Sequence, residues 1–257
     1  MMKLLLLAAF TLTLPTGVLT AQEDLPPKRI RFIPLGELPV WKETLENGIR
    51  VGQEPPPGSM PPKELSVLAG EENLIPFRAG LRSMSEILTI PGNTPRLQIN
   101  QGKIGAASPW LSTKLPAAPL SLGILYRDPA AMTWNSPKLF LLKDDPSSFP
   151  AGNIRFTNVS DTMVIVQIGD WNAPRPPSVY GIPPGQTSMK PLKVGTNQIR
   201  VGYAGPGGSK RWIWANQVRL LQNQRVQGFF YKAQGKDPRN PVLFHFVPEP
   251  LPKVPAT

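Results

Sequence analysis

Proline is the residue that most constrains the fold of this chain. The sequence has 33 prolines in 257 residues, spread over almost its whole length. Proline has no backbone N–H to donate to a sheet, and its ring blocks the interior of a helix. This distribution predicts short β-strands joined by rigid turns.

The N-terminus has the features of a secretory signal peptide over residues 1–21. Lys3 gives a positive start, residues 4–14 are apolar, and Ala21 is a small residue at the expected cleavage point. The apolar stretch is too short to span a membrane, and no later stretch is long enough. We therefore expect an exported protein, periplasmic or extracellular, with no membrane span.

The chain contains no cysteine. Small extracellular domains of eukaryotes are often held together by disulfides, so an exported chain without them favours a protein of the bacterial envelope. The same absence excludes thiol catalysis, cysteine–zinc sites and iron–sulfur sites.

Short apolar or alternating runs recur at spacings typical of β-sandwiches. In residues 29–33, Ile30 and Phe32 alternate with arginines, which predicts a half-buried strand. Residues 80–88, "GLRSMSEIL", are the best helix candidate. After residue 146, about seven strands fit an immunoglobulin-like sandwich without its usual cysteine pair. Gly185 in "IPPGQT" suits a type II turn.

The segment "DDPSSFPAGNIRFTN", residues 144–158, predicts a joint between two domains. The expected fold is all-β, with two tandem immunoglobulin-like β-sandwich domains after the signal peptide. The domains would cover residues 22–145 and 146–248, followed by a proline-rich tail at 249–257. The alternative is a calcium loop built from Asp144, Asp145 and Asp161, although these lack the alternating oxygen ligands of such a loop.

This joint, with "VQIGD" and "IPPGQT" after it, resembles an uncharacterised family of exported bacterial proteins with two β-sandwich domains. The likeness is strongest over residues 139–170. In that family an Asp-Asp-Pro…Phe-Pro-Ala-Gly…Arg-Phe-Asn segment joins the halves, whereas here Thr157 lies between the phenylalanine and the asparagine. The resemblance implies a fold and a location, but no activity, cofactor or catalytic residue.

Charge is distributed unevenly along the chain, whose net charge is +11. Residues 22–145 contain 14 basic and 13 acidic residues, and residues 146–257 contain 13 basic and 4 acidic ones. A cationic second half would attract polyanions such as acidic polysaccharide, and export argues against nucleic acid as the partner. The alternative is a solvated basic surface without a dedicated site.

The sequence offers little for catalysis. His245 is the only histidine. It alternates with Phe244 and Phe246, so it faces away from their rings, and no G-x-S-x-G motif is present. We therefore expect no enzyme activity, no cofactor and no metal site, with a hydrolase as the alternative from another class.

The most suggestive segment is "KRWIWANQVR", residues 210–219. We predict that Trp212 and Trp214 share one face of a strand, with Lys210, Arg211 and Arg219 nearby. Exposed indoles would stack on sugar rings, and the cations would pair with acidic groups. The alternative, favoured by the larger gain from burial, is that both indoles belong to a sandwich core. The resulting hypothesis is a non-catalytic protein that binds a glycan or polyanion, or that docks on another envelope protein.

Overall fold

The structure is a computed structural model that describes residues 25–40, 42–69, 73–94, 96–102, 109–127, 131, 133–234 and 239–252. The signal peptide expected at residues 1–21 lies outside these ranges. Within them the chain is all-β, as predicted, with eighteen strands and one short 3-10 turn, η1 (Pro206–Gly208). None of these ranges contains a helix with the length and apolar character needed to cross a membrane.

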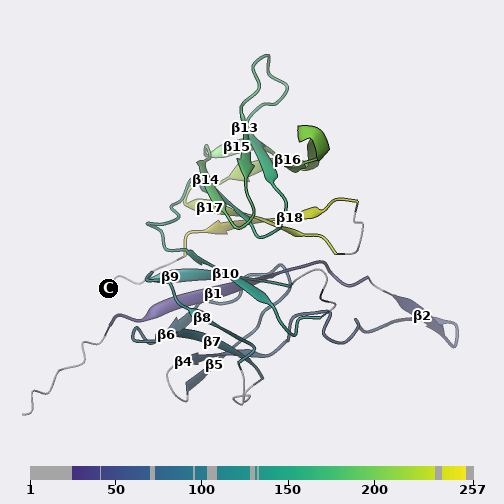
Figure 1. Cartoon of the computed structure of the whole chain (residues 1–257), viewed down its shortest axis with the longest axis vertical. Coiled ribbons are helices and arrows are strands. Elements are labelled where there is room, and N and C mark those ends of the chain that lie inside the picture. The colour runs from purple at the N-terminus through teal and green to yellow at the C-terminus, as the bar shows by residue number, and fades with distance from the viewer. Residues whose placement is uncertain are drawn as a thin grey trace, which may run out of the picture.

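The N-terminal unit contains two four-stranded sheets that pack face to face. Its inner sheet has the order β10 (Lys138–Lys143), β9 (Leu120–Tyr126), β1 (Lys28–Leu35), β6 (Leu88–Ile90). Its outer sheet has the order β5 (Asn73–Phe77), β4 (Leu65–Ala69), β7 (Arg96–Gln101), β8 (Leu111–Lys114). A two-stranded hairpin, β2 (Glu43–Glu46) and β3 (Ile49–Gly52), projects from this unit (Figure 1).

The C-terminal unit has the same arrangement of two sheets around a core. Its inner sheet has the order β14 (Thr187–Pro191), β11 (Asn153–Asn158), β17 (Gln224–Lys232), β18 (Val242–Pro250). Its outer sheet has the order β13 (Val179–Ile182), β12 (Val164–Ile168), β15 (Gly195–Ala204), β16 (Lys210–Leu220).

The two inner sheets pack against each other, so the molecule is a stack of four layers (Figure 1). We call the interface between the inner sheets the seam. Side chains of β1, β9, β17 and β18 form an apolar cluster there that includes Ile33, Ile124 and Phe229. The alternating sequence of β1 predicted that only one of its faces would be buried. The seam explains why both faces are buried. The face that carries Arg31 is covered by the other unit, and Arg31 is buried.

The two units share one topology. If the eight sandwich strands of each unit are numbered in chain order, both inner sheets have the order 4-1-7-8 and both outer sheets have the order 3-2-5-6. In both inner sheets the pair formed by strands 1 and 7 is parallel, and the other neighbouring strands are antiparallel. The chain is therefore a structural duplication, with the β2–β3 hairpin as an addition to the first copy.

The registers of the strands show which residues of the two units are equivalent. Phe32 pairs with Gly123 across β1 and β9, and Phe156 pairs with Gly228 across β11 and β17. Equivalent residues of the two units lie in the seam, such as Leu35 with Val159 and Ile124 with Phe229. The register gives these equivalent pairs: Arg31 and Arg155, Asp144 and Glu249, Leu35 and Val159, Tyr126 and Tyr231, Arg127 and Lys232.

Two local predictions are wrong and one is confirmed. Residues 80–88 form a turn and the start of β6, because Arg82 has a positive φ and Ser85 bonds to the backbone of Phe32. The proline-rich tail does not begin at 249, because β18 continues to Pro250 and Glu249 is buried. Gly185 has the positive φ expected for its turn.

Candidate functional site

A β-bulge separates the two tryptophans that the sequence placed on one face. Val201 of β15 pairs with Trp214, and the next residue, Gly202, pairs with Trp212, so Ile213 is the extra residue. A bulge places two residues opposite one and reverses the alternation of side chains beyond it. Gly202 permits β16 to approach β15 closely at the bulge, because a Cβ atom at this position would lie 2.0 Å from the carbonyl oxygen of Arg211.

Trp214 belongs to the core of the C-terminal unit. Its ring lies against Phe244 and Phe246, with centroid distances of 5.2 and 5.7 Å. The prediction that both indoles share a face is therefore wrong, because the bulge turns only one of them inward. For Trp214 the core alternative holds.

Trp212 lies on the opposite, outward face of the outer sheet. The guanidinium of Arg200 on β15 lies 4.2 Å from the centroid of Trp212 and 5.3 Å from that of Trp171, which follows β12. Arg200 Nε also donates a hydrogen bond of 2.7 Å to Oε1 of Gln167 on β12. Both indoles are half-buried. We call Trp171, Arg200 and Trp212 the aromatic–cation stack.

The predicted cations lie at opposite ends of β16. Lys210 and Arg211 are exposed at its start, next to Trp212. Arg219 is exposed near its end, where it pairs with Thr196 of β15. At about 3.3 Å per residue, the seven steps from Trp212 to Arg219 span roughly 23 Å, so Arg219 lies outside the stack.

The joint segment contributes to a buried cluster of charged residues at one end of the seam. Asp144, directly after β10, is fully buried. Its Oδ2 accepts from Arg31 Nη2 at 2.6 Å and from Arg225 Nη2 at 3.0 Å, and its Oδ1 accepts from Arg155 Nη2 at 2.5 Å. Three arginines from three strands therefore converge on one carboxylate.

Glu249 on β18 is the second carboxylate of this cluster. It accepts from Arg31 Nη1 at 2.5 Å and from Arg225 Nε at 3.0 Å. Backbone carbonyls accept some of the remaining N–H groups, such as Lys143 O from Arg155 at 2.6 Å. Burial by itself lowers the pKa of Arg31, but Glu249 and Asp144 raise that pKa above its ordinary value. We call these five residues and Gln227, which donates to both carboxylates, the seam cluster.

The three aspartates of the alternative calcium loop have separate partners in the structure. Asp145 accepts hydrogen bonds from Ser147 and Ser148 and closes the turn, and Asp161 pairs with Lys232 at 2.8 Å. The calcium hypothesis is wrong for this structure, because each of the three aspartates has other partners. Among the described residues no group of acidic and histidine side chains has the makings of a metal site.

His245 faces the seam, opposite to Phe244 and Phe246, as its alternation predicted. Its Nε2 lies 2.8 Å from the carbonyl oxygen of Arg82, so this nitrogen donates. A hydrolase triad would require a serine or aspartate side chain at that position. Its contact with a backbone carbonyl ties the two units together instead.

Acid should destabilise the fold through His245, because the buried imidazole lies near the positive charge of Arg82. Burial lowers the pKa of His245; the hydrogen bond to the Arg82 carbonyl raises it, and the charge of Arg82 lowers it, with a lowered pKa as the result. The unfolded chain therefore binds the proton more readily than the folded chain. The contribution of His245 to the stability of the fold is complete above its unfolded pKa of about 6.5, and it is lost as the pH falls through its folded pKa. We expect the urea midpoint to drop between pH 7.5 and 5.5, and to drop less for His245→Gln. Equal pH slopes for the two proteins would contradict this.

The sequence missed Trp171, Arg200 and the seam cluster. Arg200 is one of the residues of β15 whose side chains point outward. Only the pairing of three separate strands brings it between two indoles. The partners in the seam cluster are up to 218 residues apart. A repeated sequence is the one available signal: Ile-Arg-Phe occurs at both 30–32 and 154–156.

No protein-family model and no curated protein matches this chain. Among solved structures, it is similar to a DUF3823 family protein from Bacteroides ovatus ATCC 8483, with 7% identity and a TM-score of 0.21 over 76% of this chain and 100% of the other. It is also similar to the Bacillus anthracis TIE protein, with 10% identity and a TM-score of 0.20 over 86% of this chain and 43% of the other. Similarities this low carry no argument about fold or function. The family resemblance at residues 139–170 stays a prediction.

Proposed function

We propose that this chain is a non-catalytic, exported protein of the bacterial envelope that binds acidic glycans on the outward face of its C-terminal unit. The binding surface consists of the aromatic–cation stack together with Lys210 and Arg211. The observation that carries the proposal is the position of Arg200 between two half-buried indoles on an outward sheet face.

The chemistry of this surface suits a sugar acid. The apolar face of a sugar ring packs against an indole, and a guanidinium pairs with a carboxylate through charge-assisted hydrogen bonds. In the part of the chain that the structure describes, no ion pair involves Arg200. The uneven charge of the chain supports the same partner, because residues 146–257 carry 13 basic and only 4 acidic residues.

Binding to a trisaccharide of galacturonic acid should depend on salt and on Trp212. Screening lengths of about 10 Å at 0.1 M salt and about 3 Å at 1 M predict clear binding at low salt and weaker binding at high salt. Trp212→Ala should weaken binding about fivefold, as expected for a loss of about 1 kcal/mol from stacking and cation–π contacts. Calorimetric titration measures both effects.

The matched control is Arg219→Gln, which removes a cation from the same strand but outside the stack. Its affinity should equal that of the unmodified protein. The proposal fails if no binding occurs at low salt, or if Trp212→Ala and Arg219→Gln have the same affinity.

A further inference from the structure

The outward face of the outer sheet in the C-terminal unit extends well beyond the aromatic–cation stack. This sheet is the end layer of the molecule, so no other sheet covers it (Figure 1). Ile199, Val201 and Val218 of β15 and β16 point into the core. Because side chains alternate along a strand, the residues next to them point outward. The long pair of strands β15 and β16 therefore presents a continuous outward surface.

The register of β15 and β16 orders the residues along this surface. Beyond the stack, Gln198 of β15 pairs with Gln217 of β16, and two residues further on Thr196 pairs with Arg219. Two amides, a hydroxyl and a second guanidinium thus follow the stack in one direction along the strands. We call these four residues, together with the stack, the polar track.

The layer that carries the polar track is rich in cations. Between Asp170 and Asp237 the sequence contains ten basic residues and no acidic one, and β12 contains no charged residue. Asp170 itself accepts from the backbone N–H of Asn172 at 2.9 Å and closes its own turn. Among the residues that the structure describes, no carboxylate pairs with Arg219. A bound polyanion would therefore meet cations at both ends of the polar track.

The middle of the polar track offers hydrogen bonds that the protein does not use. Oε1 of Gln198 is buried and has no hydrogen-bond partner within the described ranges. A buried acceptor without a partner calls for a donor, such as a ligand hydroxyl or a water molecule. Gln217, directly across from it, is exposed. Two neighbouring amides suit sugar hydroxyls, because an amide both donates and accepts.

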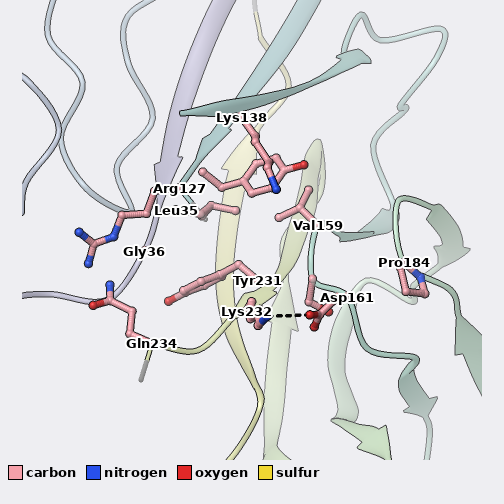
Figure 2. Close-up of a pocket in the computed structure, with 12 residues that line it drawn as sticks. Leu35, Gly36, Arg127, Lys138, Val159, Asp161, Pro184, Tyr231, Lys232 and Gln234 are labelled. Carbon is pink, nitrogen blue, oxygen red and sulfur yellow. Dashed lines mark ion pairs between the residues drawn. The ribbon is translucent and has the colours of Figure 1, made fainter. Parts of the chain in front are cut away.

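The enclosed space in this molecule suits a chain of sugars less well than the open polar track does. Side chains of both units line a pocket of about 280 Å³ (Figure 2). This volume is near the lower end of the roughly 300–1,000 Å³ of pockets for single small molecules. One of its cations, Lys232, is already paired with Asp161 at 2.8 Å. A ligand longer than one or two sugars therefore requires the open face.

We propose that the polar track binds an extended acidic oligosaccharide, with one sugar carboxylate at Arg200 and another at Arg219. This inference rests on the proposed function and adds the length of the ligand and its direction along the strands. Trp212 and Arg219 are roughly 23 Å apart at about 3.3 Å per residue, a distance that a hexasaccharide spans and a trisaccharide does not. Hydroxyls of the intervening sugars bond with Gln198 and Gln217.

The length of the ligand provides the test, by calorimetric titration at low salt with the trisaccharide and the hexasaccharide of galacturonic acid. The hexasaccharide should bind at least fivefold more tightly, because it gains a second ion pair and the hydrogen bonds of the two amides. Arg219→Gln should weaken hexasaccharide binding about threefold to fivefold, as expected for an exposed ion pair, and leave trisaccharide binding unchanged. Trp212→Ala should weaken the binding of both ligands.

The matched control is Lys114→Gln. Lys114 is an exposed cation at the end of β8, the strand of the N-terminal unit that corresponds to β16. This variant should bind both ligands like the unmodified protein, which separates a contact in the polar track from a general effect of net charge. The inference is overturned if Arg219→Gln and Lys114→Gln bind the hexasaccharide equally well.

The two ligands also separate this inference from the proposed function. If the trisaccharide binds but the hexasaccharide binds no more tightly, the extended polar track is overturned and the proposed function stands. If the trisaccharide does not bind at low salt, the proposed function fails, and the inference that rests on it fails as well.

Discussion

Replacing Asp144 with asparagine is expected to lower the free energy of unfolding by about 3–5 kcal/mol, the cost typical of breaking a buried ion pair by removing one partner. The two side chains have nearly the same shape, so the change removes a charge and leaves the packing. Asp144 is fully buried and contacts Arg31, Arg155 and Arg225. Without its carboxylate, Glu249 alone would face three buried guanidinium groups.

The position of the seam cluster predicts a change in the cooperativity of unfolding, in addition to the loss of free energy. Its arginines come from β1 of one unit and from β11 and β17 of the other, so it connects the two inner sheets. Weakening it should reduce the coupling between the units. Calorimetry should therefore show one transition for the unmodified protein and a broader or split transition for Asp144→Asn.

Glu43→Gln provides the control for this prediction. Glu43 pairs with Arg50 at 3.6 Å on the exposed hairpin, where an ion pair contributes about 0–1 kcal/mol. Urea unfolding of both variants measures the difference. A loss of less than about 1 kcal/mol for Asp144→Asn would mean that the buried cluster contributes no more than a surface pair.

The sequence predicted the fold class because its signals are local. Alternation in residues 29–33 and 153–158, together with proline and glycine at the turns, indicates strands whatever they pack against. It could not predict that Arg31 and Arg155 are buried, because that depends on the second sandwich covering the polar face. An alternating strand normally has one face in water, and here that face is the seam.

Only part of the candidate site was predicted, because the rest depends on how separate strands pair. Trp212 lies on an outward face among cations, but a bulge that only the pairing with β15 reveals turns Trp214 inward. The duplication could have been found from the sequence. Ile-Arg-Phe at residues 30–32 and 154–156 is followed in each half by related segments, "GILYR" at 123–127 and "GFFYK" at 228–232. Aligning these segments would have paired Arg31 with Arg155 and Tyr126 with Tyr231.

Replacing Gly228 with alanine is expected to destabilise the protein by about 1–3 kcal/mol, the cost of adding a methyl group to a well-packed core. Gly228 lies opposite Phe156, whose ring covers it: a Cβ atom would lie 2.8 Å from Cδ1 of that ring. Phe156 is fully buried against Phe230 and Phe244, so it has no space into which to move. Denaturant unfolding measures the change in free energy.

Because the chain is a structural duplication, the same substitution can be tested at the equivalent glycine of the N-terminal unit. Gly123 lies opposite Phe32 in the same way, with a Cβ position 2.6 Å from Cδ1 of that ring, so Gly123→Ala should cost a similar amount. Gly181→Ala is the matched control in a strand, because a Cβ atom there meets only the Met163 sulfur at 3.4 Å. It should be neutral or stabilise by up to about 1 kcal/mol, since alanine restricts the unfolded chain. If Gly228→Ala and Gly123→Ala behaved like Gly181→Ala, the ring-over-glycine pairs would not be packing constraints that the two units share.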